Sequence, residues 1–535
     1  MGNDNHCHRG SKFASPERGQ TLTGLELQEY KISMNDDMFN DAIREKASRI
    51  TKAVKWSDID WKTAYEYVNR LQIRIVKATE KKNWNLVKRL QYLLTNSFYA
   101  KALAVKKVTS NRGKRTPGID NEIWNSDEKK WNAINTLRSV GYKALPTKRI
   151  HIPKSNGKKR PLSIPTMRDR AMQTLFCLAL QPIEETTADE HSYGFRMNRS
   201  CHDACEQIFA DLSLKNSAQW VLEGDIKGCF DNISHEWMLN NIPMERNILK
   251  QFIKAGFIFQ NKLFPTSRGA VQGGAISPTL ANLVLDGLEQ RIWEEINIGK
   301  SGKVVKLKNL HKVHLIRYAD DFVITGESKE ILLKVKDVVI TFMSERGLQL
   351  SEEKTLITNI QDGFDFLGWN FRKYNNKLII KPSKKSIKRF SDSLTETVKH
   401  LLPAEQGLLI LKLNEKLRGW CNYHSTVCSK EAFKTIDFMV FRKLIGWMKR
   451  KHNNKHVHRF YAKYWKTIGK RKNVFTDGKW ILVNCSYTPI VRHPKLKSKM
   501  NPYTSTEYFD KRAEFINERK KKARKRVAAA NPAYV

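Results

Sequence analysis

Residues 311–326 read "HKVHLIRYADDFVITG", and two adjacent aspartates lie there between two apolar runs. The runs 313–318 and 322–325 have the composition of β-strands and leave only a few residues for a tight turn. Neighbouring side chains on a regular strand point to opposite faces, so Asp320 and Asp321 converge only if the backbone turns there. We therefore predict a strand, a turn that carries carboxylates and a second strand. In isolation, such a hairpin tip would simply be polar and solvated.

A second acidic site lies about ninety residues upstream, in "WVLEGDIKGCFDNIS" at residues 220–234. Here an apolar strand ends at Asp225. If this strand lies beside the first, Asp225 meets Asp320 at one sheet edge, and the edge can include Asp321. Three carboxylates that close repel one another strongly unless cations lie between them. Two Mg²⁺ ions about 3.5–4 Å apart are the standard arrangement for in-line attack at phosphorus, as in polymerases and nucleases.

The charge of the chain points to nucleic acid as the partner. Its 535 residues include 96 Lys and Arg against 54 acidic residues, a net charge of +42. An apolar fraction of 40% with 13 Trp, 24 Phe and 16 Tyr indicates a folded chain rather than a basic disordered one. A folded polycation attracts nucleic acid because each neutralised phosphate releases counterions. A diffusely basic surface and an anionic membrane are the alternatives, and nucleic acid is favoured over both.

Cysteine usage and hydropathy indicate an intracellular protein. The eight cysteines include no CxxC pair, which fits a reducing compartment. No apolar run reaches 18 residues, and the N-terminal "MGNDNHCHRG" lacks the apolar core of a signal peptide. We expect a soluble protein with no membrane partner.

The periodicity along the chain predicts a mixed α+β fold. From Trp56 onward, apolar residues recur at helical spacing. Residues 149–170 contain two short β-prone pieces joined by an Asn-Gly turn, followed by a helix over about 168–180. Helices and strands then mix up to about residue 380, and a helical pattern starts at Lys384. Residues 511–526 are predicted to form a solvated basic helix or tail. The apolar stripes expected to be buried are Leu71, Ile75 and Ala78, then Leu86, Leu90, Leu93 and Leu94, and later Leu409, Leu413, Leu417 and Trp420.

Seven ordered blocks together resemble the reverse transcriptases with maturase activity that group II introns encode. They are "RPLSIPTMRDR", "SYGFRMNRS", "GDIKGCFDNI", "GAVQGGAISPTLANLVLDGLE", "RYADDFVI", "LQLSEEKT" and "FDFLGW", and "LRGWCNYH" resembles the maturase motif. The resemblance covers about residues 55–510. A Y-x-D-D motif alone would be weak, whereas seven blocks in the family's order make chance agreement implausible.

The resemblance implies a right-hand polymerase with fingers, a palm built on an antiparallel sheet, a helical thumb and a basic C-terminal DNA-binding region. The boundaries expected on this basis are 1–50 for an N-terminal extension of unknown role, 51–382 for fingers and palm, 383–465 for the thumb or maturase domain and 466–535 for the DNA-binding region. Many relatives continue into an HNH endonuclease, which is lacking here. We therefore expect this chain alone to be unable to cut the second strand of a DNA target.

The resemblance also implies roles for individual residues. Asp225, Asp320 and Asp321, with the backbone carbonyl of Ile226, would hold two Mg²⁺ ions, and Lys354 would protonate the leaving pyrophosphate. The residues implied in dNTP binding are Lys154, Arg160, Phe230 and Gln272; Phe230 would be the steric gate against a ribose 2′-hydroxyl. Those implied in primer and template contact are Gly273, Phe366, Leu367 and Gly368. Those implied in maturase RNA binding are Arg418, Trp420, Asn422 and Tyr423.

Each role has a plainer alternative. Lys154, Arg160 and Lys354 have the character of surface cations, and Phe230 and Trp420 that of core residues. Both readings of Phe230 are compatible.

The function expected is RNA-directed DNA synthesis for a group II intron, with binding of the structured intron RNA to assist its splicing and mobility. The partners implied are intron RNA, an RNA template, a DNA primer or target DNA, and dNTPs, and a dimer is compatible with the family. The location implied is the bacterial cytoplasm, at the nucleoid when target DNA is bound. The alternatives are a splicing cofactor without polymerase activity, an RNA-dependent RNA polymerase, which Phe230 opposes, and a domesticated reverse transcriptase in phage defence or repair.

Overall fold

The computed structural model describes residues 55–153, 157, 159–299, 301–306, 308–453, 457–469 and 471–530. The proposed N-terminal extension and Lys154 lie outside the described residues. The chain forms two compact units. The first comprises Met1–Thr187, Phe230–Val284 and Asn501–Thr506, and the second comprises Ala188–Cys229, Leu285–Met500 and Glu507–Val535.

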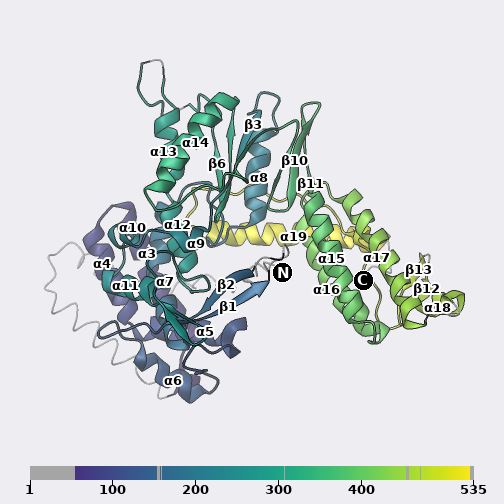
Figure 1. Ribbon diagram of the computed structural model, residues 1–535, viewed down its shortest axis with the longest axis horizontal. Helices are drawn as coiled ribbons and strands as arrows, with labels where there is room; N and C mark the ends of the chain where they lie inside the picture. Colours follow the sequence, from purple (N-terminus) through teal and green to yellow (C-terminus); the bar gives the residue numbers. More distant parts are fainter. Residues whose placement is uncertain are drawn as a thin grey trace. The chain divides into compact units, whose positions relative to one another are not determined.

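The first unit is mainly helical, and Figure 1 labels its helices except η1 and η2. They are η1 (Trp56–Asp58), α3 (Trp61–Glu80), α4 (Trp84–Asn96), α5 (Phe98–Ser110), η2 (Arg112–Arg115), α6 (Asp127–Thr136), α7 (Met167–Thr187), α9 (Cys229–Asn232), α10 (His235–Asn241), α11 (Arg246–Lys254) and α12 (Ser277–Leu285). The Asp60 side chain caps α3 by accepting hydrogen bonds from the backbone N–H groups of Lys62 and Thr63. Helices α3 and α5 both pack on α7, which runs seven residues beyond the predicted end at residue 180.

The predicted basic hairpin is confirmed in the first unit. Strands β1 (Thr147–Pro153) and β2 (Lys159–Ile164) pair antiparallel and belong to a sheet of order β2-β1-β4-β5. The other two strands are β4 (Phe257–Phe259), which pairs parallel with β1, and β5 (Lys262–Phe264). The hairpin is therefore anchored by a strand from much later in the chain.

The second unit is built on a sheet of order β6-β7-β3-β8, seen in Figure 1. Its strands are β3 (Trp220–Asp225), β6 (Leu315–Tyr318), β7 (Asp321–Gly326) and β8 (Leu356–Asn359), and each neighbouring pair is antiparallel. Helix α14 (Lys329–Ser344) packs on β3 and β7, and α8 (Cys201–Leu212) packs on β6. Helix α13 (Leu288–Ile296) packs on α14. These strands confirm the predicted strand, turn and strand around the paired aspartates.

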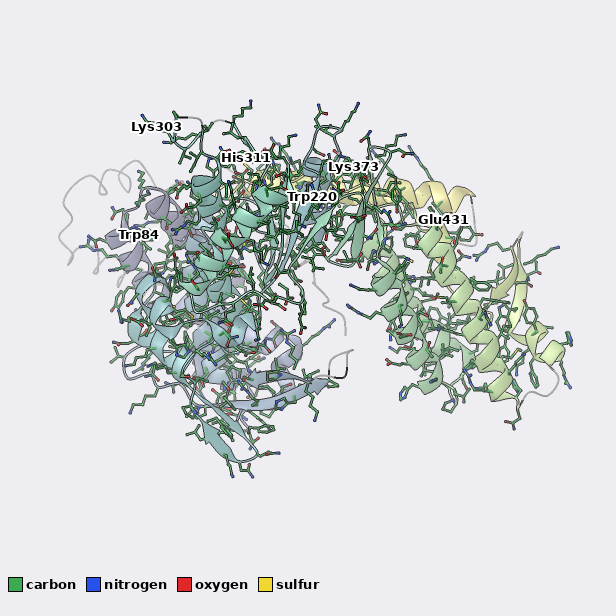
Figure 2. The ribbon with its side chains drawn as sticks, turned by 45° about the horizontal axis from the view of Figure 1, so that its top comes forward. Trp84, Trp220, Lys303, His311, Lys373 and Glu431 are labelled. Atoms are coloured by element: carbon green, nitrogen blue, oxygen red, sulfur yellow. The ribbon has the colours of Figure 1, made fainter. Side chains whose placement is uncertain are left out.

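A second sheet of order β11-β10-β9 continues the core of this unit. Its strands are β9 (Phe364–Phe366), β10 (Trp369–Tyr374) and β11 (Lys377–Pro382). Trp369 and Phe371 on β10 are fully buried and join the apolar cluster beneath α8. Lys373 on the same strand, labelled in Figure 2, is 4% exposed and donates hydrogen bonds to the Leu214 carbonyl and the Ser217 hydroxyl. Those two bonds offset the cost of burying its charge.

The predicted helical segment begins at Lys384, as expected from the sequence. It contains α15 (Lys384–His400), α16 (Gln406–His424), α17 (Lys430–Lys451) and α18 (Val457–Tyr464), followed by the hairpin of β12 (Trp465–Ile468) and β13 (Arg471–Phe475), η3 (Cys485–Tyr487) and α19 (Thr506–Ala530). One apolar cluster joins α15, α16 and α17 to this hairpin, and Leu409, Leu413 and Leu417 are all part of it. Within the described residues, no helix is both long enough and apolar enough to span a membrane.

Candidate active site

The β6–β7 hairpin has its turn at Ala319 and Asp320. Ala319 has a φ of 58°, and Tyr318 pairs with Asp321 across the turn. Two glycines permit this arrangement: a Cβ on Gly194 would lie 2.2 Å from the Ala319 nitrogen, and one on Gly224 would lie 2.1 Å from the Phe322 ring. Gly194 thus allows close approach to the turn backbone, and Gly224 makes room for the Phe322 ring directly after it.

Strand β3 brings the upstream acidic site beside this turn. In its antiparallel register with β7, Asp225 lies directly opposite Asp321. The segment that carries Lys354 is attached to the same strand end, because the Ser351 N–H donates to the Asp225 carbonyl at 2.8 Å. An isolated bridge between Ile226 and Leu350 extends this attachment. The three predicted aspartates, Ile226 and Lys354 therefore meet at one end of the sheet.

The electrostatics of this end are those of crowded negative charge. The protein atoms packed around its carboxyl, followed by the charges of Asp320 and Asp225, raise the pKa of Asp321 to about 6. The Asp321 side chain nevertheless reaches solvent, and the repulsion comes from the carboxylates of Asp320 and Asp225. The Lys354 ammonium lies 2.9 Å from Asp225 Oδ2, and this hydrogen bond raises the pKa of Lys354.

The donor set suits a hard divalent cation, because three carboxylates and a backbone carbonyl are the oxygen ligands that Mg²⁺ prefers. The elevated pKa of Asp321 shows that the cluster gains from added positive charge. As the side chains stand, however, no three carboxylate, imidazole or thiolate groups of the described residues are close enough to hold a metal ion together. Lys354 provides the positive charge at Asp225 in this arrangement.

A buried ion pair behind the hairpin was not predicted. Arg317, directly before Tyr318, is 0% exposed, and its guanidinium pairs with the Asp286 carboxylate. Asp189 lies close by, where burial and then the charge of Asp286 raise its pKa. Its Oδ1 accepts a hydrogen bond from the Gly287 N–H at 2.9 Å. Arg317 lies in the block "RYADDFVI" and Asp286 in "LVLDGLE". A charged residue within each apolar stretch was the sequence signal that could have indicated a buried ion pair.

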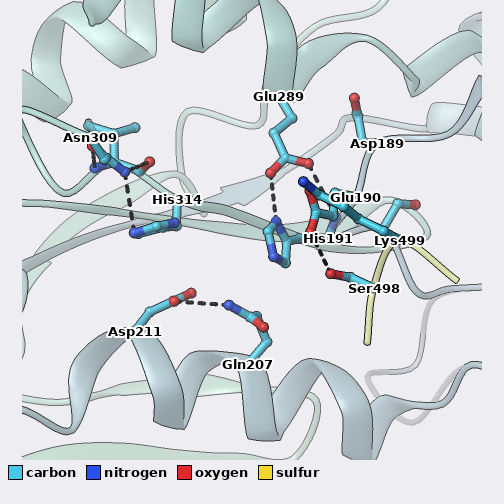
Figure 3. A network of polar contacts seen from close by, with 12 residues as sticks. Asp189, Glu190, His191, Gln207, Asp211, Glu289, Asn309, His314, Ser498 and Lys499 are labelled. Carbon is cyan, nitrogen blue, oxygen red and sulfur yellow. Dashed lines mark hydrogen bonds and ion pairs between the residues drawn. The ribbon is translucent and has the colours of Figure 1, made fainter. Parts of the chain in front are cut away.

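A polar network shown in Figure 3 supports β6, the first strand of the hairpin, through residues 189–193 beside it. The His191 carbonyl accepts from the Arg317 N–H, while the His191 ring and N–H both contact the Glu289 carboxylate, the ring at 2.6 Å. The neighbouring Glu190 accepts a hydrogen bond from the Ser498 hydroxyl at 2.6 Å. These contacts hold residues 189–193 along the edge of β6.

Arg160, Phe230 and Gln272, which are implied in dNTP binding, lie in the first unit. Gln272 is in the loop before α12, and Arg160 and Phe230 both contact this loop. Arg160 on β2 is exposed and donates through Nε to the Gln272 side-chain oxygen at 3.3 Å. The Gln272 carbonyl accepts from the Ser163 N–H at 2.8 Å, and a Cβ on Gly273 would lie 2.6 Å from the Ser163 oxygen. Gly273 also has a φ of 106°, a conformation that only glycine adopts readily. Both the close contact and the φ value therefore require glycine at this position.

The same loop holds the candidate steric gate. The Ala270 N–H donates to the Phe230 carbonyl at 2.7 Å, and Gly269 packs against the same backbone. The Phe230 side chain is half-buried. These contacts fix the backbone from which the Phe230 ring projects.

The block "FDFLGW" forms a tight turn between β9 and β10. Leu367 and Gly368 have φ values of 49° and 81°, and Phe366 pairs with Trp369 across them. Two positive φ values at the centre of a two-residue hairpin are typical of a type I′ turn. The Tyr423 hydroxyl on α16 donates to the Leu367 carbonyl at 2.7 Å, which ties this turn to the helical segment.

The four residues implied in maturase RNA binding divide into two pairs. Arg418 and Asn422 on α16 are exposed. Trp420 stacks on Phe390, with ring centroids 4.9 Å apart, and Tyr423 stacks on Trp369 at 4.6 Å. The aromatic pair therefore packs the protein interior, and the polar pair remains available at the surface.

Three family models match the chain. The model for the N-terminal domain of reverse transcriptase matches residues 56–137, and the model for reverse transcriptase (RNA-dependent DNA polymerase) matches residues 152–371. The maturase-specific domain of group II introns matches residues 387–465. The three matches follow one another along the chain and include the Asp225, Asp320 and Asp321 region.

Curated relatives agree with these matches. The group II intron-encoded protein LtrA of Lactococcus lactis subsp. cremoris is 29% identical over 475 residues, covering 72% of this chain and 76% of that protein. Protein YkfC of Escherichia coli K12 is 32% identical over 314 residues, covering 53% of this chain and 82% of that protein. A telomerase structure from Candida albicans gives a TM-score of 0.34 at 13% identity, covering 60% of this chain and 62% of that one. On the family models and the first two relatives, the chain belongs to the group II intron-encoded reverse transcriptases, which join an RNA-dependent DNA polymerase domain to a maturase domain.

Proposed function

We propose that the chain synthesises DNA on an RNA template at the carboxylates of Asp225, Asp320 and Asp321. The observation that carries this is the register of β3 on β7, which sets Asp225 opposite Asp321 beside the turn that holds Asp320. Mutually repelling carboxylates at one sheet end lower stability unless they serve to bind cations. An inert polymerase site would have no reason to keep them.

The three aspartates and the Ile226 carbonyl would hold two Mg²⁺ ions after their side chains rotate toward one another. Bound there, such ions would lower the pKa of a primer 3′-hydroxyl and neutralise the pyrophosphate. Lys354 would leave Asp225 as this happens, because the ammonium and a cation compete for the same carboxylate. Its proton would then be available to the departing pyrophosphate.

The remaining residues bind and select substrates in this proposal. Arg160 would grip the triphosphate through its guanidinium fork, together with Lys154, and Gln272 would lie near the nascent base pair. Phe230 would exclude the ribose 2′-hydroxyl and so favour deoxynucleotides. Gly273 and the turn of Phe366, Leu367 and Gly368 would position template and primer.

The helical segment supplies a second role. We infer that residues 383–465 form the thumb or maturase domain, that 466–535 bind DNA and that 51–382 form the fingers and palm. Arg418 and Asn422 would contact structured intron RNA, stabilising its splicing-competent fold and supporting intron mobility. We propose that the protein acts in the bacterial cytoplasm, at the nucleoid when target DNA is bound.

Primer extension by purified protein on an RNA template, with Mg²⁺ and dNTPs, tests the polymerase proposal. Asp320→Asn should abolish synthesis, because a metal loses a ligand, while RNA affinity in filter binding stays within about twofold. Asp362→Asn, an exposed aspartate in the loop before β9, is the matched control and should behave as wild type. Substantial synthesis by Asp320→Asn would refute the assignment. A wild-type protein that binds RNA but makes no DNA would support a splicing cofactor instead.

A further inference from the structure

A basic pocket of about 420 Å³ lies in the second unit, on the side of α16 that carries Arg418 and Asn422. Its volume is in the range of roughly 300–1,000 Å³ that is usual for small-ligand sites. Four lining residues are basic, and none of the described residues that line it is acidic. The four are Arg418 on α16, Arg471 on β13, and Lys520 and Arg524 on α19.

One wall of the pocket is largely apolar. It is formed by residues 481–491, including Ile481, Leu482, Val483 and Pro489. The lining also includes the side-chain amides of Asn422 on α16 and of Asn484 within this wall. The lining thus offers an apolar surface, amide groups and positive charge within one cavity.

Hydrogen bonds hold this wall in place. Asn414 on α16 donates to the Ile481 carbonyl at 2.8 Å and accepts from the Val483 N–H at 2.8 Å. The Val491 N–H donates to the Ser425 carbonyl at the end of α16. The wall and α16 are therefore joined into one block, and the pocket exists before anything binds.

Two of the four basic side chains, Arg471 and Arg524, also make contacts within the protein. The Arg471 guanidinium lies 4.8 Å from the centre of the Tyr487 ring, and Arg524 donates to the Asn422 side-chain oxygen at 3.3 Å. Like charges gathered around a cavity repel one another, as the three aspartates do, and an anion relieves that repulsion. The charge identifies an anionic ligand, and the apolar wall and amides indicate that the ligand is larger than an inorganic ion.

We propose that this pocket takes one unstacked nucleotide of single-stranded RNA, with its phosphate at the arginines and its base against the 481–491 wall. Proteins that read RNA bind such splayed nucleotides by packing the base on side chains, including arginine planes, and by hydrogen bonds to its edges. Duplex DNA keeps its bases stacked unless an enzyme extrudes one for chemistry, and the described residues that line the pocket include no carboxylate or imidazole to act on such a base. This inference rests on the proposed RNA-binding role of Arg418 and Asn422, and it adds an RNA nucleotide site to which residues of the proposed DNA-binding region 466–535 contribute.

Photo-crosslinking of the full chain tests the pocket directly. The probe is a single-stranded RNA containing 4-thiouridine, compared with a DNA of the same sequence containing 4-thiothymidine, and crosslinked peptides are mapped by mass spectrometry. Wild type should crosslink to RNA within residues 481–491. Arg471→Gln should reduce those crosslinks about tenfold, the effect of losing one hydrogen bond to a charged group. Lys472→Gln removes the same charge from the adjacent, exposed position of β13, which does not line the pocket, and should change nothing.

The outcomes separate the pocket from the wider RNA-binding role. RNA that is retained on filters but gives no crosslink in 481–491 would overturn the pocket alone. Equal loss in Lys472→Gln would also overturn it, since general charge would then explain the effect. Crosslinking by DNA at the level of RNA would refute the choice of RNA as occupant. RNA that fails to bind wild type at all would remove the maturase proposal and the pocket with it.

Discussion

Lys354 Nζ lies 2.9 Å from Asp225 Oδ2, at the end of the strand that sets Asp225 opposite Asp321. The lysine side chain is 64% exposed, so the ion pair is weak in stability terms and easily exchanged. When no metal is bound, the Lys354 ammonium supplies positive charge beside the carboxylates of the proposed metal site. Lys354 and Mg²⁺ are therefore expected to compete for Asp225.

Lys354→Gln should separate the two proposed roles of this lysine. Loss of a general acid should lower the single-turnover rate of primer extension by about a hundredfold. Loss of the competing ammonium should at the same time reduce the Mg²⁺ concentration needed for half-maximal rate. A Mg²⁺ titration of wild type, Lys354→Gln and the charge-retaining Lys354→Arg measures both effects. An unchanged rate in Lys354→Gln would mark it as an ordinary surface cation.

Phe230→Ala should weaken discrimination against ribonucleotides. The backbone of Phe230 is held by the Ala270 N–H, and truncation to alanine removes the half-buried ring that would fill the space beside the sugar. Relative incorporation of each nucleotide, as kcat/KM for a dNTP and its rNTP, should shift toward the rNTP by about tenfold or more. Phe230→Tyr keeps the ring and serves as the control. Unaltered selectivity in Phe230→Ala would place sugar selection elsewhere.

Asp286→Ala should destabilise the second unit. It leaves the fully buried Arg317 guanidinium without its carboxylate, and breaking a buried pair costs about 3–5 kcal/mol. Thermal unfolding should shift downward by several degrees, and primer extension should fall because Arg317 directly precedes the Tyr318 turn. Asp337→Ala, an exposed aspartate on α14, is the matched control and should unfold like wild type. Equal melting temperatures for the two variants would show that the pair contributes little.

The main elements were predictable because their signals are local. Alternating apolar strands and the short turn between them are specified by neighbouring residues, which is why β3, β6 and β7 appear where expected. The helical stripe near residue 90 was predicted less well: Leu90 and Leu94 are buried, but Val87 is buried where Leu86 was expected. Leu86 and Val87 lie at the edge of the apolar helix face, where the sequence pattern does not show which of two adjacent residues is buried.

The missed features depend on contacts between distant segments. Nothing local marks Arg317 and Asp286 as partners, because they are 31 positions apart and meet only through tertiary packing. The basic segment 511–526 was predicted as a solvated helix or tail. It does form a helix, but Lys520 and Arg524 line a pocket with α16. Composition indicated the charge and could not indicate which surface it faces.

One buried and one half-buried histidine, His424 and His202, should make the second unit sensitive to acid. Burial, followed by the charge of His202, lowers the pKa of His424 to about 3, and burial lowers that of His202 to about 4. Each is neutral when folded and has a pKa near 6.5 when unfolded, so the unfolded state takes up protons first as pH falls. Their contribution to stability is complete above about pH 6.5 and is lost progressively toward pH 4.

His424→Gln tests this pH dependence. At pH 5 the wild type should have lost roughly 2 kcal/mol through His424 alone, from a gap of about 1.5 pH units between pH 5 and the unfolded pKa. The difference in melting temperature between pH 7.5 and pH 5 should therefore be smaller in His424→Gln than in wild type. His400→Gln, at an exposed histidine on α15, should keep the full wild-type difference. A wild-type difference in His424→Gln would mean that His424 titrates normally, which its 1% exposure against Trp369 and Trp420 argues against.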